Sequence, residues 1–436
     1  MDKRIPKILH IGAYFALLAL PVVLVLLYIS TNSVLLITRA IQILLSILFG
    51  ASFSYVCIYA YVTKFFRDSV LSYVGTKLLL AFVIFACILG TITLYGPMGI
   101  FRTWLITTAM DTMEHQYLCK WFYSDEQIAK VYADNYTVYL DSDVDPSLIN
   151  TKNTNKKKVL EDLRSTINSS EGMLLEKDEY ALILEKVNGQ NAYVAIIFDP
   201  SKVVLGYSKY ISSGRGQFVT NMAEDAGAVL AINAAGFYDE GGTSSGGRPV
   251  GLTIADGKVI SKDTETNIGT EYAKKGGLIG FNANNVLILA KDVDATSAEK
   301  MGIRDAVSWG PFLVVNGESL FVKGNGGYSC SSRSAIGQRA DGAVIFITVN
   351  SSNTRMRGAS MQDLADLMIK YGAVNAANLD GGTSTGMVAP SADAKIASSK
   401  ASPCNSTSNY WFINYPTNAS MEHKTRIVAD CWMVMP

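Results

Sequence analysis

Histidine is scarce in this chain: His10, His115 and His423 are the only three among 436 residues, and they lie far apart in the sequence. Zinc sites built on paired histidines, such as the HExxH motif, are therefore absent. Charged residues are also few, at 17% of the chain against about 25% in ordinary soluble proteins. The scarcity of histidine excludes enzymes with paired-histidine metal sites, and the shortage of charge directs attention to where the charges lie.

The shortage of charge is confined to the first quarter of the chain. Residues 1–110 contain only ten charged side chains, whereas the other 326 residues contain 66, a normal density for a globular domain. The first segment carries eight basic and two acidic groups, so the remainder has a net charge of −6. An acidic soluble part argues against a nucleic-acid partner, because phosphates need a basic surface. We therefore predict a membrane module followed by a soluble module.

Three long apolar runs predict an all-α transmembrane module with three helices, at about 11–30, 40–62 and 78–97. Each run is close to the ~20 residues that a helix needs to cross a bilayer. A cleaved signal peptide would explain the first run alone, but Leu20-Pro21 offers no small-residue cleavage site and two more runs follow.

The basic residues beside these runs predict their orientation. Three precede the first run and three lie between the second and third, whereas the loop between the first two runs contains only Arg39. By the positive-inside rule the N-terminus is cytoplasmic and the chain after about residue 110 lies outside the cytoplasm. We therefore expect a multi-pass protein of the cell membrane with an extracytoplasmic C-terminal domain. A disulfide is feasible there, and Cys404 with Cys431 is the first pair to consider, although spacing does not fix the pairing.

The soluble module is predicted to consist of a connector, 111–179, and a mostly β domain of the α+β class, 180–436. The connector contains a predicted helix at 124–135 and a polar run at 151–158 that is typical of a loop. Two helices are expected within the domain, at about 217–227 and at 360–372, where Ser360 is a good N-cap. Short runs of β-branched and aromatic residues bounded by Gly, Asn and Asp predict strands within 191–200, 202–211, 228–233, 249–260, 277–290, 311–322 and 342–350.

Three glycine-rich segments follow predicted strands and are candidates for the chemistry: 231–252, 331–337 and 376–388. Glycine lets a backbone approach a ligand closely. In the third segment, Asp380 stands at a strand end before Gly-Gly-Thr-Ser, where a catalytic acid, base or nucleophile could be placed. Each segment taken alone is more typical of an ordinary turn than of a functional site.

Together the segments resemble the phosphodiester glycosidase family over about 190–436. The shared motifs, in order, are Asp199-Pro200, the Asn-Ala-Ala-Gly-Phe-Tyr box at 233–238, Pro-Val-Gly at 249–251, a Gly-Pro segment at 310–317, Arg-Ser-Ala-Ile-Gly at 333–337, Arg357-Gly358, and Asn-Leu-Asp-Gly-Gly-Thr-Ser at 378–384. The chain departs from the family pattern at Tyr238, Ser334 and Thr383, and these departures bear on substrate detail more than on reaction class.

The resemblance implies hydrolysis of a phosphodiester at the anomeric carbon of a sugar, with a phosphomonoester as the leaving group. The implied catalytic residues are Asp380, as nucleophile or stabiliser of positive charge, and Arg333, as a paired donor to phosphate oxygens. Asn233 is expected to bond a sugar hydroxyl or to hold Asp380. The remaining expected substrate-binding residues are Arg357, Gly381, Gly382, Thr383, Ser384 and Asp239, the last also as a general base for water.

Several alternatives stay open at this point. A transferase that passes the glycosyl group to a polymer hydroxyl, in exopolysaccharide or teichoic acid assembly, would need the same residues. A non-catalytic glycan-binding protein would keep the fold without turnover. A transporter is disfavoured because the span centres lack charged residues. The expected partners are the membrane and a glycan that contains sugar phosphate, and the sequence shows no need for a cofactor while leaving a structural divalent cation open.

Overall fold

The computed structural model describes residues 89–90, 92–96, 99–110, 116–138, 143–152, 154–167, 172–239, 244–262, 277–328, 330–351, 358–403, 408–414 and 425–436. The chain forms two compact units, Met1–Asp134 and Asn135–Pro436. The first two predicted spans and most of the third lie outside the described residues. Within the described ranges, no helix has the length and apolar character needed to cross a membrane. The three-span module therefore stays a prediction.

The described part of the first unit is helical, with α4 (Gly99–Met110), α5 (Gln116–Lys120) and α6 (Asp125–Asp134) around a small apolar core. Ser124 and Gln127 cap α6 reciprocally: Ser124 Oγ accepts from the Gln127 amide at 3.2 Å, and Gln127 Oε1 accepts from the Ser124 amide at 3.0 Å. The helix predicted at 124–135 is thus confirmed.

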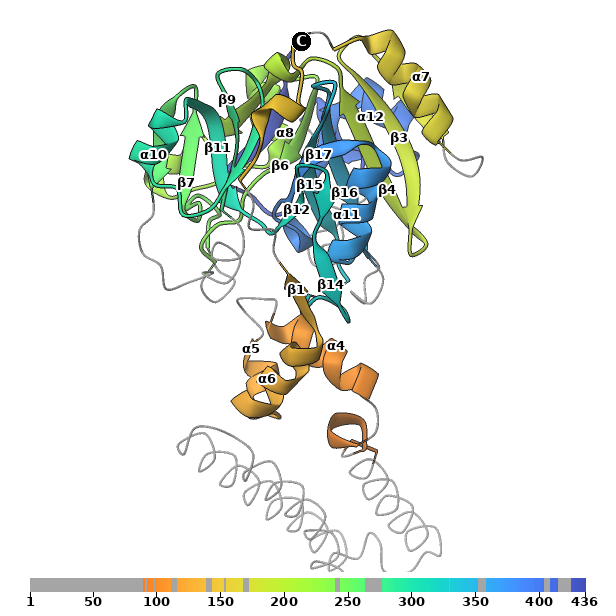
Figure 1. The fold of residues 1–436 in the computed structure, drawn as a ribbon, viewed down its shortest axis with the longest axis vertical. Helices are drawn as coiled ribbons and strands as arrows, with labels where there is room; N and C mark the ends of the chain where they lie inside the picture. The colour runs from red at the N-terminus through yellow and green to blue at the C-terminus, as the bar shows by residue number, and fades with distance from the viewer. Residues whose placement is uncertain are drawn as a thin grey trace, which may run out of the picture. The chain divides into compact units, whose positions relative to one another are not determined.

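Antiparallel sheets build the second unit (Figure 1). The eight-stranded sheet runs in the order β13 (Glu318–Ser319), β12 (Phe312–Val315), β17 (Ala373–Asn378), β15 (Arg333–Arg339), β16 (Val344–Val349), β4 (Gln190–Ile197), β3 (Tyr180–Val187) and β2 (Gly172–Glu176). The six-stranded sheet runs β19 (Ser402–Pro403), β20 (Tyr410–Phe412), β18 (Met387–Pro390), β6 (Leu230–Asn233), β21 (Asp430–Val434) and β5 (Val203–Tyr207). The five-stranded sheet runs β10 (Leu287–Ala290), β9 (Gly277–Asn282), β11 (Ile303–Trp309), β7 (Leu252–Ala255) and β8 (Lys258–Lys262), and β1 (Tyr136–Val138) pairs with β14 (Phe321–Lys323).

Strand alternation explains how the sheets and helices stack. In β21, Trp432 and Val434 belong to the core between the sheets, whereas Cys431 and Met433 face the opposite side, against α8 (Val219–Ala226). Trp432 meets Phe281 of the five-stranded sheet edge-on at 5.5 Å between ring centroids. Burial of such side chains stabilises the fold by about 1.5–3 kcal/mol each.

Helices cover the outer face of the eight-stranded sheet. The helix α11 (Met361–Lys370) begins with a capping box between Ser360 and Asp363 and buries Leu364 and Met368 against the sheet, so both predicted helices of the domain are confirmed. The interpretation of 151–158 as a loop is wrong at its end, because α7 (Lys156–Thr166) begins there under an Asn155 cap and packs its apolar side on the same core. Two shorter helices, α10 (Ala295–Lys300) and α12 (Ser391–Ala397), also belong to the described part of this unit.

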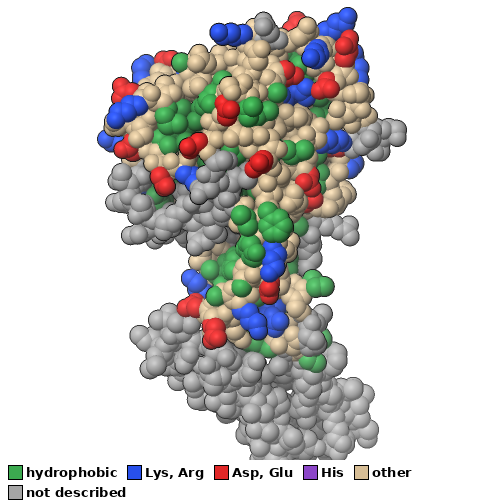
Figure 2. Space-filling model, in the orientation of Figure 1, with side chains coloured by type: hydrophobic (Ala, Val, Ile, Leu, Met, Phe, Trp, Pro, Cys, Tyr) green, Lys and Arg blue, Asp and Glu red, His purple; other side chains and the backbone are tan. Residues whose placement is uncertain are grey.

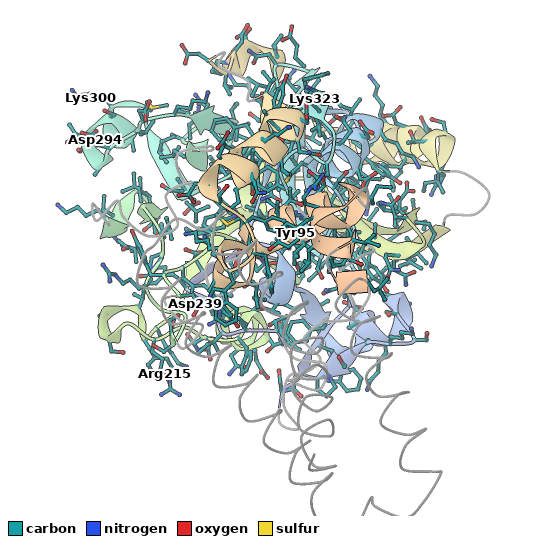
Figure 3. All side chains as sticks on the ribbon, turned by 90° about the horizontal axis from the view of Figure 1, so that it is seen from below. Tyr95, Arg215, Asp239, Asp294, Lys300 and Lys323 are labelled. Carbon is teal, nitrogen blue, oxygen red and sulfur yellow. The ribbon has the colours of Figure 1, made fainter. Side chains whose placement is uncertain are left out.

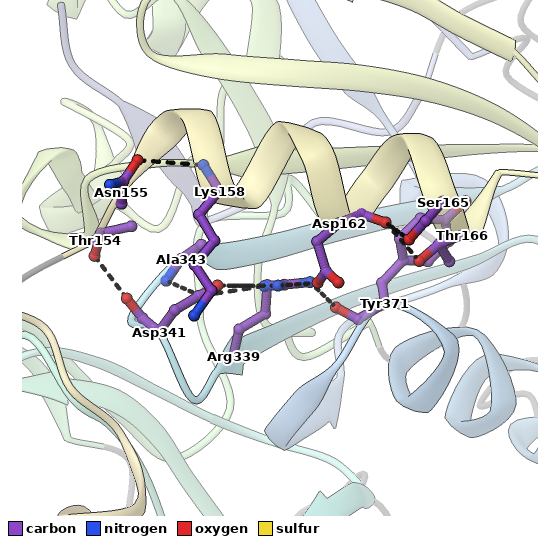
Figure 4. A network of polar contacts seen from close by, with 10 residues as sticks. All are labelled: Thr154, Asn155, Lys158, Asp162, Ser165, Thr166, Arg339, Asp341, Ala343 and Tyr371. Atoms are coloured by element: carbon purple, nitrogen blue, oxygen red, sulfur yellow. Dashed lines mark hydrogen bonds and ion pairs between the residues drawn. The ribbon is translucent and has the colours of Figure 1, made fainter.

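A buried arginine, Arg339, ties α7 to the sheet (Figure 4). It donates to Asp162 of α7 at 2.6 Å, to Asp341 at 2.9 Å and to the Tyr371 carbonyl at 2.8 Å. These partners lie on α7, on the turn after β15 and at the end of α11, so Arg339 holds these elements together.

The mostly β architecture with a few helices confirms the fold class predicted for the domain. Cys431 is a free cysteine with no exposed surface. The pairing of Cys404 with Cys431 is therefore wrong, and the physical reason is that Cys431 faces the apolar core beneath α8. Cys404 itself lies outside the described residues.

Candidate active site

The candidate site lies where strand ends from the two larger sheets meet. Asn233 ends β6 and Asp380 follows the end of β17, while Arg333 begins β15 and Asp430 begins β21. Because β15 runs antiparallel to β17, and β21 antiparallel to β6, these starts and ends fall at one edge. The topology thus gathers residues that are up to 197 positions apart, from 233 to 430, in one place.

Asn233 joins the two sheets through its side-chain amide. It is fully buried, its Nδ2 donates to the Asp380 carbonyl at 2.7 Å, and its Oδ1 accepts from Ser334 Oγ at 2.7 Å and from the Gly386 amide at 3.0 Å. These bonds occupy both ends of the amide. Of the two roles expected for Asn233, holding the Asp380 turn is the one that these contacts support.

The turn after β6 is packed against the five-stranded sheet. A β-carbon at Gly236 would lie 2.1 Å from the Trp309 ring, so only glycine permits this contact. This close approach explains the glycine of the 233–238 box from packing alone, and it fixes the path of the chain toward Asp239.

Asp380 has a carboxyl group with a raised pKa. Burial raises the pKa to about 6, against the Ser384 hydroxyl, the Arg426 guanidinium and the Gly381 amide, which lower it, and the Asp239 carboxylate adds a small further rise. The Gly381 amide donates to Asp380 Oδ1 at 3.0 Å, and the Asp380 amide donates to the Ala234 carbonyl at 2.9 Å. The group can therefore exchange a proton near neutral pH, as a general acid or base must.

Asp239, in contrast, is kept in its ionised form by Arg426. The two side chains form a bidentate ion pair, with Arg426 Nη2 at 2.9 Å from Asp239 Oδ1 and Nη1 bonded to Oδ2. The Ser244 amide donates to the same Oδ1 at 3.1 Å. Although burial opposes it, this pairing holds the pKa of Asp239 below its ordinary value. Asp239 therefore stays ionised, with its oxygens occupied by donors.

Arg333 lies beside the turn that carries Asp380. It is 3% exposed, its Nε donates to the Ala359 carbonyl at 3.4 Å, and its guanidinium lies 5.9 Å from the centre of the Tyr328 ring. A β-carbon at Gly381 would be 3.7 Å from Arg333 Nη1, which places the guanidinium against this turn. A cation at this position can hold an anionic group near Asp380.

The remaining predicted residues lie in the same turn, except one. Gly382, Thr383 and Ser384 form a short 3-10 turn in which the Gly382 amide donates to the Ser332 carbonyl at 2.8 Å and the Thr383 carbonyl accepts from the Arg426 amide at 3.0 Å. Arg357 lies outside the described residues. In the described part of the chain, no group of three or more His, Cys, Asp and Glu side chains could hold a metal ion.

Two residues of the site were missed in the sequence. Arg426 lies 187 positions from its partner Asp239, and no local pattern marks it. Asp430 is fully buried, its Oδ1 accepts from the Ala235 amide at 2.9 Å, and burial, with the neighbouring Asp380, raises its pKa to about 7. The one signal for Asp430 in the sequence was its position directly before the apolar residues 431–434, where a carboxylate is unusual.

Comparisons with known proteins agree with the resemblance noted in the sequence. Residues 226–435 match the model of the phosphodiester glycosidase family. The SPbeta prophage-derived uncharacterized protein YomE of Bacillus subtilis (strain 168) is 29% identical over 192 residues, which are 43% of this chain and only 28% of that protein.

Two solved structures are also similar. The zebrafish N-acetylglucosamine-1-phosphodiester alpha-N-acetylglucosaminidase catalytic domain, auto-inhibited by its pro-peptide, is 16% identical, with 68% of this chain and 96% of that chain covered and a TM-score of 0.45. A putative exported protein of Burkholderia pseudomallei K96243 is 16% identical, with 59% and 74% covered and a TM-score of 0.37. The matched segment contains Asn233, Asp239, Arg333, Asp380 and Arg426, and over residues 226–435 this chain is similar to the phosphodiester glycosidase family.

Proposed function

We propose that this protein hydrolyses a sugar-1-phosphodiester, such as an N-acetylglucosamine-1-phosphodiester, in a cell-surface glycopolymer or exopolysaccharide. The observation that carries the proposal is the gathering of Asp380, Arg333 and Asn233 at one edge of the two larger sheets, and the contrasting environments of two neighbouring carboxyl groups support it. The pKa of Asp380 is raised to about 6 and that of Asp239 is lowered by Arg426. Pairs of carboxyl groups separated in this way are characteristic of enzymes that move protons.

The proposed reaction needs little general-acid catalysis, because its leaving group is already a stable anion. The bond between C1 of the sugar and the phosphate oxygen breaks, and its electron pair leaves with the phosphomonoester, which is a stable anion. Arg333, with Arg357, is proposed to bind the phosphate oxygens through paired, charge-assisted hydrogen bonds. The oxygen of a water molecule forms the new bond to C1.

Asp380 is proposed to act at the anomeric carbon. As a carboxylate it stabilises the positive charge that develops there, and it accepts the proton that the attacking water loses. Asp239 is less suited to accept that proton, because Arg426 and the Ser244 amide occupy its oxygens. In this proposal Asp239 and Arg426 shape the site, and Asn233 holds the turn.

The test is the release of free sugar. The full-length protein is incubated with UDP-N-acetylglucosamine and with N-acetylglucosamine-1-phosphate diesters, and free N-acetylglucosamine is quantified. Asp380→Asn is expected to lower turnover by about 100-fold or more. The control is Asp366→Asn, on the exposed side of α11, which should leave turnover unchanged. Wild-type protein without release of sugar from any of these diesters would refute hydrolysis, and sugar transferred to an added alcohol would favour a transferase.

The location of the activity is part of the proposal. We propose that three N-terminal helices anchor the protein in the cell membrane and that the catalytic unit lies outside the cytoplasm. The apolar runs and the distribution of basic residues support this location. Acidic and basic side chains are mixed over the face in Figure 2 rather than gathered by sign, which suits a glycan partner better than nucleic acid.

A further inference from the structure

A cavity of about 360 Å³ lies in the second unit, and none of the proposed catalytic residues lines it. Its walls come from the connection between β5 and α8, from α8 itself, and from Ser408 and Ile427. In Figure 3, Arg215 of this cavity and Asp239 of the candidate active site are labelled in the same region of the view. The volume falls within the range of small-molecule sites, about 300–1,000 Å³.

The charged groups of the cavity balance one another. Lys209 donates to Asp225 at 2.7 Å, and the Glu224 carboxylate accepts from Ser408 Oγ at 3.2 Å. With Arg215, the lining contains two cations and two anions. A lining without net charge is a poor match for a strongly charged ligand such as phosphate or a divalent cation, and a better match for a neutral polar one.

The uncharged groups of the cavity suit a sugar. Tyr210 is 44% exposed and contributes an aromatic ring, while Asn221 contributes an amide. The Gln217 amide is bonded to Lys209 and Asp225 and the Ser408 hydroxyl to Glu224, so these two groups belong to the wall. A pyranose has hydroxyls that both donate and accept hydrogen bonds, and a face of C–H groups that packs on an aromatic ring. The Asn221 amide can exchange hydrogen bonds with the hydroxyls, and the Tyr210 ring can pack against the C–H face.

The walls are fixed without a ligand. Ser208 is fully buried, and its Oγ donates to the Arg215 carbonyl at 2.8 Å and accepts from the Tyr210 amide at 3.1 Å. Gln217 is 6% exposed, and its Oε1 accepts from the Lys209 amide at 2.8 Å. Because these groups are already ordered, binding would cost little conformational entropy.

Two short connections join the cavity to the candidate active site. The Gly216 amide donates to the Ser245 carbonyl at 2.7 Å, and the amide of the preceding residue, Ser244, donates to Asp239. Ile427 lines the cavity, while its neighbour Arg426 binds Asp239. The cavity and the ion pair are therefore built on the same two segments of the chain.

We propose that this cavity is a subsite for a neutral sugar residue, and that the residue belongs to the glycan whose phosphodiester is hydrolysed. The second half of the statement rests on the proposed function. The first half concerns binding alone and can be tested without turnover.

The test uses isothermal titration calorimetry on the full-length protein, in a detergent without a sugar headgroup. The probes are chitotriose and maltotriose, two neutral trisaccharides. At least one is expected to bind, and Tyr210→Ala should weaken that binding at least tenfold. The matched control is Tyr207→Ala, which removes a tyrosine of similar exposure, 41%, that does not line the cavity.

The melting temperature of each variant is measured beside the titrations, and Asn221→Ala replaces Tyr210→Ala if the latter does not fold. The proposal is overturned if neither trisaccharide binds, if the cavity variants bind like the wild type, or if inorganic phosphate binds in place of the sugars. Trisaccharide binding that depends on Tyr210, in a protein that releases no sugar from phosphodiesters, would support the subsite while refuting the proposed hydrolysis.

Discussion

Asp430 offers a quantitative test of the electrostatics beneath the site. Its carboxyl has no exposed surface and lies on the face of β21 that packs between the sheets. Burial raises its pKa from 3.8 to about 7. At about 1.4 kcal/mol per unit of pH, ionisation of this group in the folded protein costs on the order of 4 kcal/mol.

The sign of the effect follows from where the proton is held. Between pH 4 and pH 7 the folded protein keeps the Asp430 proton and the unfolded chain releases it. The free energy of unfolding of the wild type should therefore fall as pH rises through this window, and the contribution should level off above the folded pKa. Asn does not titrate, and its oxygen can still accept from the Ala235 amide, so Asp430→Asn should lack this part of the fall.

The measurement is the free energy of unfolding of the full-length protein from denaturant titrations at intervals between pH 4.5 and pH 8. The difference between Asp430→Asn and wild type should move in favour of the variant by several kcal/mol across the range. Asp239→Asn is a control without this dependence: because the pKa of Asp239 is lowered, its contribution to stability is already present at pH 4.5 and is lost only in more acidic solution, so the difference between that variant and wild type should stay constant across the range. Parallel curves for wild type and Asp430→Asn would refute the reasoning.

Three further predictions address the guanidinium groups and the topology. Arg426→Gln leaves the largely buried Asp239 carboxylate without its ion pair, so the free energy of unfolding should fall by about 3 kcal/mol in denaturant titrations. The acid limb of the rate profile should also move to higher pH in this variant, because Arg426 lowers the pKa of Asp380. Arg333→Lys should raise KM about tenfold or more in the sugar-release assay, because an ammonium cannot make the paired bonds of a guanidinium. A C-terminal tag should be removed by protease added to intact cells, and a tag protected until the membrane is permeabilised would contradict the proposed topology.

The parts of the fold set by local signals were predictable from the sequence. The capping box at Ser360 and the apolar spacing of 361–368 specify α11, and both signals involve residues only a few positions apart in the sequence. The strand segments were recognisable from β-branched and aromatic runs. The start of α7 was missed because Lys156, Lys157 and Lys158 give it a polar first turn, and its apolar positions come only afterwards. The order of the strands in the sheets depends on contacts distant in sequence, and no local signal predicts it.

The candidate site was predictable only where its residues fall in compact motifs. Asp380 and Arg333 stand in such motifs. Arg426 is a lone basic residue, and it joins the site because the segment that precedes β21 runs beside the 244–246 turn, where Arg426 bonds Asp239 and the Ser244 carbonyl. Asp430 joins the site because its strand pairs with β6 in the register that sets Cys431 opposite Asn233. Register is a property of the whole sheet, so these two contributions could not be inferred from spacing.

The placement of Arg426 explains why two neighbouring carboxyl groups behave differently. The Arg426 guanidinium makes direct hydrogen bonds to Asp239. Its effect on Asp380 is a Coulomb attraction, which adds to the hydrogen bonds from Ser384 and Gly381. At Asp239 burial raises the pKa, but the direct pair with Arg426 and the Ser244 hydrogen bonds together outweigh it; at Asp380 the lowering interactions do not outweigh burial. One cation therefore yields one carboxylate that stays charged and one that exchanges its proton near pH 6. On the proposed mechanism, the rate profile should have an acid limb that reports on Asp380, and below this limb the site should lose the negative charge that the proposed transition state needs while the Asp239–Arg426 pair remains intact.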